Sequence, residues 1–337
     1  MFPDIPFYVA ILFVLVGLYL LSWSANKFID GSSAVAKALG VSPFIIGMVV
    51  IGFGTSAPEL FVSALSGFAD KSDLSLGNAY GSCIFNIAVI LGVASIIRPL
   101  QVKPSSTFVA VPALISISAL SCLLVAAGGG FSRMDGIILL VVFAVLLPVY
   151  CWFDQKQKNE MKAKQSEPPS DEPQPRMGRA CFDLVLGLAL LVGSSHILVW
   201  GSVDLARAMG VSELLIGLTI VAAGTSLPEL ASAVVSARKG EHEFVLGNII
   251  GSNFFNTLAV VGLAGSISPF KNISPYVLSR DMPVMMLMSL LIAVFGVNFR
   301  RPRRSGFIDY REGIAWILMF LVYLGVMIYQ ETNLFGN

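Results

Sequence analysis

Charged residues are scarce in this chain of 337 residues. Asp, Glu, Lys and Arg together make up 13% of it, whereas hydrophobic residues make up 55%. Soluble proteins carry roughly 25% charged residues, so this composition argues against a water-soluble fold of this size. The formal net charge is only +1, and the sequence has no basic domain of the kind that binds nucleic acid. The scarcity of charge therefore predicts an integral membrane protein.

Cysteine and histidine are also rare. The four cysteines, Cys83, Cys122, Cys151 and Cys181, lack the spacing of a disulfide framework or of a zinc site. We interpret them as small apolar packing residues. The second histidine, His242, lies in a predicted loop and gives His196 no partner for a metal site, so we interpret His196 as a packed or interfacial side chain.

Apolar runs of about 20 residues, the length that spans a bilayer as a helix, make up most of the chain. Ten are expected to be transmembrane helices: 5–24, 43–68, 74–97, 106–127, 134–152, 181–200, 213–236, 244–267, 281–298 and 312–330. A polar segment, residues 153–180, separates the fifth run from the sixth. It has too few large apolar side chains to form a core, and we predict that it is a flexible linker.

The loops divide the basic residues unequally between the two sides of the membrane. If the N-terminus is outside, the inside loops hold seventeen of the 22 basic residues: Lys27, Lys37, Arg98, Lys103, Lys156, Lys158, Lys162, Lys164, Arg176, Arg179, Arg238, Lys239, Arg300, Arg301, Arg303, Arg304 and Arg311. The outside loops hold the other five, Lys71, Arg133, Arg207, Lys271 and Arg280. Cytoplasmic loops carry the excess of Lys and Arg. We therefore predict a plasma-membrane protein with both termini outside and a cytoplasmic linker.

The two halves of the chain repeat each other at an offset of 170 residues. Between Gly31 and Pro99 the alignment with 201–269 runs without a gap, and 27 of the 69 pairs are identical. Each half, 1–152 and 181–337, has five predicted spans, so the second copy must cross the membrane in the opposite sense. This predicts an all-α membrane protein of two inverted five-helix repeats, an architecture of transporters whose site lies where the repeats meet.

The second and seventh predicted spans each contain a polar cluster that should break the helix. Proline lacks an amide hydrogen and its ring clashes with the carbonyl group four residues earlier. The residues concerned are Gly54, Thr55, Ser56, Pro58 and Glu59 and their copies Gly224, Thr225, Ser226, Pro228 and Glu229. A carbonyl group freed in this way must find a partner inside the membrane, and a bound cation is one partner that would satisfy it.

The third and eighth spans carry polar side chains at strict four-residue spacing, which places each set on one helical face. They are Asn78, Ser82 and Asn86, and Asn248, Ser252 and Asn256. Glycines between them, at 77, 81, 247 and 251, would permit close helix packing. The stripes have two interpretations: cation ligands or interhelical hydrogen bonds, the second being strongest for Asn78 and Asn248.

Glu59 and Glu229 are the only acidic residues that this segmentation places deep in the membrane. An ionised side chain there costs at least about 2.5 to 3.5 kcal/mol, and no Lys or Arg lies at matching depth to offset it. A proton or a bound metal cation is therefore expected. Two carboxylates together with hydroxyl, amide and carbonyl oxygens suit calcium, sodium or magnesium rather than zinc or copper, and a dehydrating cage favours calcium over magnesium.

The segments GTSAPEL with GNAYGSCIFN, and GTSLPEL with GNIIGSNFFN, resemble the alpha-1 and alpha-2 repeats of the calcium/cation antiporter superfamily, and most closely those of the bacterial sodium/calcium exchangers. The repeats correspond to 47–92 and 217–262. The resemblance implies that Glu59 and Glu229 are central ligands of the transported ions. The other ligands that it implies are Thr55, Ser56, Thr225, Ser226, Ser82, Ser252, Asn86, Asn256 and the carbonyl groups near Gly52 and Ala222.

The resemblance also implies how the protein moves and which ions it excludes. The first and sixth spans would slide against the other eight to alternate access. Potassium-dependent relatives have aspartate at the position of Asn256, so asparagine here argues against potassium co-transport.

Taken together, these features predict a secondary antiporter that exchanges calcium for sodium and extrudes calcium. Proton/calcium exchange is the nearest alternative, because a glutamate can carry a proton as readily as it can bind sodium. A calcium channel is a third interpretation. The expected partners are membrane lipids and the transported cations. We expect no enzymatic activity, no cofactor and no obligate protein partner.

Overall fold

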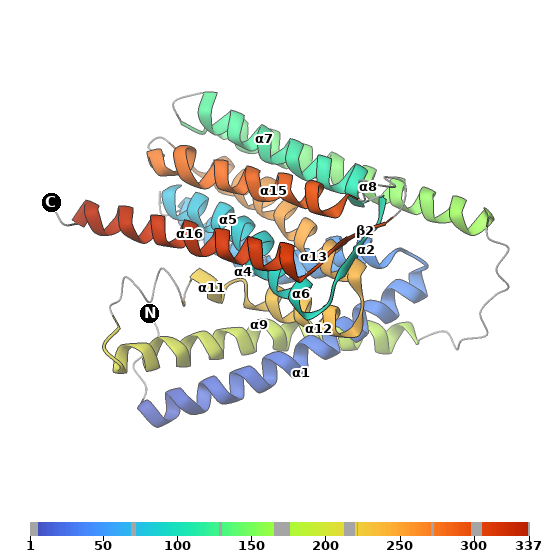
Figure 1. Ribbon diagram of the computed structural model, residues 1–337, viewed down its shortest axis with the longest axis horizontal. Coiled ribbons are helices and arrows are strands. Elements are labelled where there is room, and N and C mark those ends of the chain that lie inside the picture. The colour runs from blue at the N-terminus through green and yellow to red at the C-terminus, as the bar shows by residue number, and fades with distance from the viewer. Residues whose placement is uncertain are drawn as a thin grey trace.

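The computed structural model describes residues 6–68, 72–104, 106–127, 130–164, 176–211, 220, 222–270, 273–297 and 305–335. This part of the chain is a bundle of helices with one small antiparallel sheet at one end (Figure 1). The helical prediction is therefore confirmed.

The elements of the first half, with η marking π-helical turns, are α1 (Phe7–Leu39), α2 (Pro43–Ile45), η1 (Ile46–Ile51), α3 (Gly52–Thr55), α4 (Ala57–Phe68), α5 (Ser72–Phe85), η2 (Asn86–Leu91), α6 (Gly92–Ile97), β1 (Leu100–Val102), η3 (Ser106–Ala110), α7 (Val111–Ala127) and α8 (Arg133–Lys164). Those of the second half are α9 (Met177–Ala208), α11 (Ala222–Gly224), α12 (Leu227–Lys239), α13 (His242–Phe254), η5 (Phe255–Val260), α14 (Val261–Ile267), η6 (Val277–Asp281), α15 (Met282–Gly296), β2 (Gly306–Ile308) and α16 (Tyr310–Phe335).

Eight helices in the described part of the chain are long and apolar enough to cross a membrane, and nine if one bent pair counts as a single span. The bent pair is Pro43–Thr55 with Ala57–Phe68, and its two helices meet at 47°. The predicted span 213–236 lies partly outside the described residues. The membrane prediction is thus confirmed, and the number of ten spans stays a prediction.

The helices α1 and α9 extend well beyond their predicted ends. We expected the first span to end at residue 24, but α1 continues to Leu39, where Gly40 terminates it in the left-handed conformation with φ 65°. Likewise α9 runs past residue 200 to Ala208. The reason is that neither helix contains proline, and scattered charged side chains do not end a helix.

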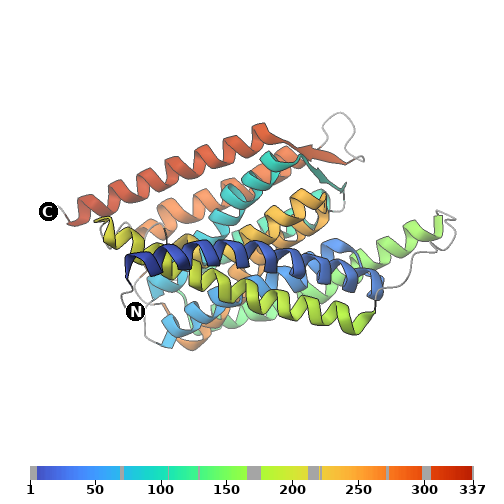
Figure 2. The same ribbon diagram turned by 90° about the horizontal axis from the view of Figure 1, so that it is seen from below.

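These two long helices, α1 and α9, lie side by side along one face of the bundle (Figures 1 and 2). Glycines bring their backbones together. A Cβ atom on Gly17 would lie 2.9 Å from the Cα of Leu198, and one on Gly187 would lie 2.5 Å from the main-chain nitrogen of Phe28. Gly17 and Gly187 are 170 residues apart, so the repeat extends into this pair of helices.

The span His242–Ile267, which begins with α13, lies at the centre of the bundle, and its most apolar stretch is completely buried. Gly247 and Gly251 let it approach η1 closely, because a Cβ atom on either would come within 2.4 Å of the carbonyl oxygen of Phe44 or Met48 respectively. This confirms the close packing predicted for these two glycines, whereas a Cβ atom on Gly77 or Gly81 would meet none of the described residues within 4 Å. By contrast, α8 and α16 expose many large apolar side chains, as helices that face lipid do.

Loops from both halves meet at one end of the bundle. There β1 pairs with β2 in antiparallel register, Lys103 forms an ion pair with Glu243, and Lys239 Nζ lies 2.6 Å from Asp30 Oδ1. At the opposite end Phe131 and Phe270 form an isolated antiparallel β-bridge, and their rings stack with centroids 5.4 Å apart. The loops predicted to lie on the same side of the membrane are therefore together, and which side is cytoplasmic stays a prediction.

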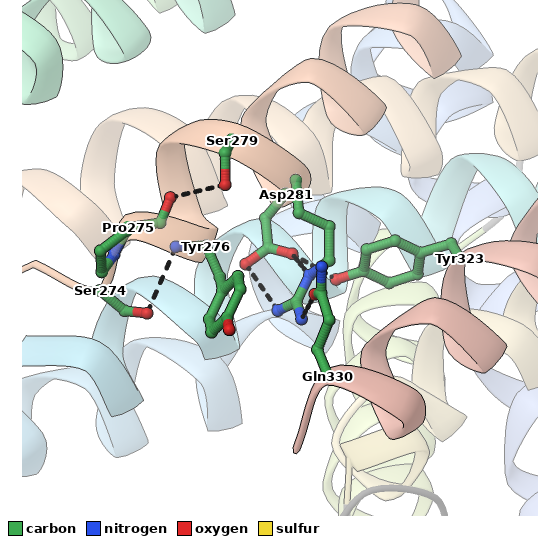
Figure 3. Close-up of polar contacts among 8 residues, drawn as sticks. Ser274, Pro275, Tyr276, Ser279, Asp281, Tyr323 and Gln330 are labelled. Carbon is green, nitrogen blue, oxygen red and sulfur yellow. Dashed lines mark hydrogen bonds and ion pairs between the residues drawn. The ribbon is translucent and has the colours of Figure 1, made fainter. Parts of the chain in front are cut away.

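A compact polar cluster joins η6 to α16 (Figure 3). The guanidinium group of Arg280 donates to both carboxylate oxygens of Asp281, at 2.6 and 3.3 Å, and to Gln330 Oε1 at 2.9 Å. The hydroxyl group of Tyr323 donates to Asp281 at 2.9 Å. Arg280, predicted to lie in a loop, is instead part of a helix and neutralises a buried acid.

The polar segment 153–180 is helical at both of its described ends. The helix α8 continues to Lys164, and α9 begins at Met177. The intervening residues 165–175 lie outside the described part of the chain. Residues 153–164 are therefore helical rather than a flexible linker, because they are good helix formers that extend α8. For residues 165–175 the flexible linker stays a prediction.

Candidate functional site

Both predicted helix breaks are present, and they have the same geometry. Ser56 (φ −82°, ψ 6°) separates α3 from α4, and Ser226 (φ −92°, ψ 9°) precedes α12. Pro58 and Pro228 lie in the first turn of the helix that follows, where the missing amide hydrogen costs no hydrogen bond. Each break therefore exposes the N-terminal end of a new helix inside the protein.

Glu59 and Glu229 lie in the first turns of these new helices. Their side chains are 0% and 2% exposed. The partial positive charge at a helix N-terminus stabilises a carboxylate, which offsets part of the cost of burying it. The sequence thus places each acid where the broken helix can partly support it.

Each carboxylate receives hydroxyl groups from the opposite repeat. The hydroxyl of Ser56 donates to Glu229 Oε1 at 3.1 Å, and that of Ser226 donates to Glu59 Oε1 at 3.3 Å. Thr225 also interacts with Glu59, and Thr55 with Glu229. The two Gly-Thr-Ser segments therefore face each other, and the two predicted halves of the site form one cluster.

Asn78 and Asn248 act alike in the two repeats. Asn78 Nδ2 donates to the main-chain oxygen of Glu59 at 3.3 Å and to Ser63 Oγ at 3.2 Å. Asn248 Nδ2 donates to the main-chain oxygen of Glu229 at 3.4 Å and to Ser232 Oγ at 3.1 Å. These amides join the stripe helices to the helices that carry the acids, which favours the interhelical interpretation for this pair.

Of the remaining predicted ligands, Gly52, Ser252 and Ala222 lie at or next to this cluster. Ser252 Oγ is 3.4 Å from the carbonyl oxygen of Gly52, which also accepts the main-chain N–H of Ser56 at 3.1 Å. Ser82 is buried, with 6% of its surface exposed. Ala222 begins α11, immediately before the second break.

Several oxygen atoms in the cluster are buried without a hydrogen-bond partner in the described part of the chain. They are Glu59 Oε2, Glu229 Oε2, Asn86 Oδ1 and Asn256 Oδ1. Asn86 begins η2, which packs against α12, and Asn256 lies in η5, which packs against α4. Buried acceptors are nearly always paired, so this group of oxygens indicates a place for a positively charged species.

Two further residues at the site were missed by the sequence analysis. The carbonyl oxygen of Gly224, which Pro228 leaves without its helical donor, accepts the hydroxyl of Ser195 on α9 at 3.0 Å. Ser195 aligns with Ala25, so the repeat itself gave no signal for it. Asn253, which aligns with Cys83, accepts a hydrogen bond from Asn86 Nδ2 at 3.1 Å. The sequence did contain a signal for Asn253, because this polar residue aligns with the less polar Cys83 in the first repeat.

Four carboxylates are buried in the described part of the chain, and two of them have cationic partners. Asp281 is paired with Arg280, and Asp204 lies 3.2 Å from Arg207. No ion pair is formed by Glu59 or Glu229 among the described residues. The described residues also contain no group of three or more His, Cys, Asp or Glu side chains that could hold a metal ion. The donors available are therefore hard oxygens, which suit calcium and sodium.

Comparison with known proteins agrees with this chemistry. The family model described as "Sodium/calcium exchanger protein" matches residues 9–152 and 181–329. The putative antiporter CaxA of Alkalimonas amylolytica is 40% identical, covering 94% of this chain and 97% of that protein. The chain belongs to the sodium/calcium exchanger family. The inner membrane protein YrbG of Escherichia coli is 35% identical, covering 93% of this chain and 95% of that protein.

The fold of this exchanger-family protein is also similar to a solved structure. The sodium-calcium exchanger NCX_Mj, in a crystal soaked with neither sodium nor calcium, superposes with a TM-score of 0.80 at 28% identity. The match covers 94% of this chain and 98% of that one. The protein is accordingly a membrane-embedded cation antiporter, and the family resemblance predicted from its two repeats is confirmed.

Proposed function

We propose that the protein exchanges calcium for sodium by alternating access and extrudes calcium from the cytoplasm. The observation that carries this proposal is the cluster of buried oxygens between the two helix breaks. Two carboxylates, one from each repeat, meet there without a cationic side chain among the described residues. A cation is the species that removes the cost of burying both charges.

The ligand set fits calcium in number and kind. Calcium takes about 6 to 8 oxygens. Glu59 and Glu229 would supply up to four, and amide, hydroxyl and carbonyl oxygens around the breaks would supply the rest. Sodium also prefers oxygen, and each carboxylate could hold sodium in place of calcium. Because calcium and sodium would use the same carboxylates, binding of one excludes the other, which is the condition for exchange.

The proposal includes ten spans in two inverted five-helix repeats, 1–152 and 181–337, with both termini outside and the segment between them cytoplasmic. The equivalent geometry at Ser56 and Ser226 supports this symmetry. So does the gathering of the basic loops at one end of the bundle. The glycine-mediated contact of α1 with α9 supports their movement as one unit.

Reconstitution of the purified protein into liposomes tests the coupling. We expect calcium uptake when sodium is loaded inside and diluted outside, with no uptake when sodium is equal on both sides. Uptake driven by a pH gradient in the absence of sodium would instead support proton/calcium exchange. Uptake that requires neither gradient would support a channel. The same assay with and without potassium tests the expectation from Asn256 that potassium is not co-transported.

A further inference from the structure

Asn253 is a buried amide that the repeat does not predict. It lies on α13, and its counterpart in the first repeat is Cys83. Its side chain lies between two groups of the first repeat. Nδ2 lies 3.4 Å from the main-chain oxygen of Cys83, and Oδ1 lies 3.1 Å from Asn86 Nδ2. Asn253 thus connects a main-chain group to one of the amides at the cation site.

The direction of these hydrogen bonds follows from what each group can do. A main-chain carbonyl oxygen only accepts, so Asn253 must turn its NH₂ group toward Cys83. Its own oxygen then points to Asn86, and Asn86 must donate. The carbonyl oxygen of the Asn86 side chain is the atom that remains, and it is buried without a donor. The orientation of two amides is therefore set by one main-chain carbonyl.

We propose that Asn253 is a positioning residue that fixes the amide of Asn86 with its oxygen available to the transported cation. This inference rests on the proposed cation site. An amide that turned over would present its NH₂ group, which carries partial positive charge, to a cation. Because Asn253 fixes the amide of Asn86 before the ion binds, Asn86 does not present its NH₂ group to the cation. Asn253 acts through Asn86 and does not itself contact the ion.

The first repeat lacks an equivalent positioning residue. Cys83 occupies the equivalent position, and its thiol approaches Thr257 Oγ1 at 3.6 Å and the main-chain oxygen of Asn253 at 3.9 Å. Both amide atoms of Asn256 are buried without a hydrogen-bond partner among the described residues. The site therefore combines one amide of fixed orientation, Asn86, with one that the protein leaves adaptable, Asn256. The two repeats are symmetric in their acids and differ in how they hold Asn86 and Asn256.

Calcium binding to the purified full-length protein tests this role. Asn253→Ala should weaken calcium binding about tenfold, as loss of a group that orients a metal ligand commonly does. The maximal rate of sodium-driven calcium uptake at saturating calcium should stay close to wild type, so that KM rises and kcat does not fall. Cys83→Ala is the matched control, and it should leave the calcium Kd within about threefold of wild type.

A bypass variant separates orientation from packing. In Asn86→Asp the two carboxylate oxygens are equivalent, so no orientation is needed, and adding Asn253→Ala should then change the calcium Kd by less than about threefold. Asn253→Leu, which fills the volume without hydrogen bonds, should behave as Asn253→Ala does and serves if the smaller residue prevents folding. An equal loss in both backgrounds, or an unchanged Kd in the single variants, would overturn the proposal.

The same experiment separates this inference from the proposed function. If the wild-type protein neither binds calcium nor takes it up with a sodium gradient, the cation site itself is wrong. If the wild type is active and Asn253→Ala and Asn253→Leu bind calcium as the wild type does, only the positioning role fails.

Discussion

At the scale of single residues, the site is held together by hydroxyl groups that cross from one repeat to the carboxylate of the other. Ser56 reaches Glu229 and Ser226 reaches Glu59. The sequence predicted all four residues, because proline and a buried acid follow Gly-Thr-Ser in both copies. It did not predict the exchange of partners, because this depends on how the two repeats face each other in the folded protein.

The crossed hydroxyls lead to a symmetric prediction. Ser56→Ala and Ser226→Ala should each weaken calcium binding by about tenfold, since a hydrogen bond to a charged group contributes about 1.5 to 3 kcal/mol. Isothermal titration of purified protein measures the loss. Ser66→Ala is the control, because that buried hydroxyl donates only to the main-chain oxygen of Val62 within its own helix. A loss in one variant and none in the other would contradict the symmetric site.

At the scale of elements, prolines predicted the breaks, but no sequence signal predicted what the freed main-chain groups would do. The carbonyl oxygen of Gly224 is satisfied by Ser195 on α9, a helix of the α1 and α9 pair. The sequence suggests a bound cation as one partner for such a carbonyl group, and in this repeat the hydroxyl of Ser195 is the partner instead. The π-helical turns η2 and η5 next to the site were equally unpredicted, because their extra residue leaves no mark in an apolar pattern.

The hydrogen bond from Ser195 to the Gly224 carbonyl oxygen should stabilise the packing of α9 against the second helix break. Ser195→Ala should lower the free energy of unfolding by about 1 to 3 kcal/mol, because it leaves the Gly224 carbonyl buried and unpaired. The measurement is the thermal unfolding temperature of the purified protein. The control is Ser194→Ala, which removes a neighbouring buried hydroxyl that donates to Leu191 within the same helix. Equal shifts for the two variants would show that the contact between helices contributes nothing of its own.

At the scale of the whole molecule, composition and the internal repeat were sufficient to predict a helical membrane protein of this family. Helix ends were predicted less well, because α1 and α9 continue past charged residues to Leu39 and Ala208. The contacts of β1 with β2, and of Phe131 with Phe270, group the loops as the charge pattern predicts. The side of the membrane on which each group of loops lies stays a prediction from the distribution of Lys and Arg.

Labelling of single cysteines tests the orientation. Phe307 lies in β2 at the end with the basic loops and is 59% exposed, whereas Met134 lies near the opposite end and is 63% exposed. In a chain whose own cysteines are replaced by alanine, a membrane-impermeant thiol reagent added to intact cells should label Met134→Cys and not Phe307→Cys. Phe307→Cys should react once the membrane is permeabilised. The reverse pattern would invert the predicted topology.

The central claim is that one cation site takes one carboxylate from each repeat. Equilibrium binding of radioactive calcium to purified Glu59→Gln and Glu229→Gln, with sodium as competitor, tests it most directly. We predict that wild type binds calcium and releases it as sodium is added. Each variant should lose calcium binding while keeping the elution profile of the folded protein. Calcium binding at wild-type affinity in either variant would contradict the shared site.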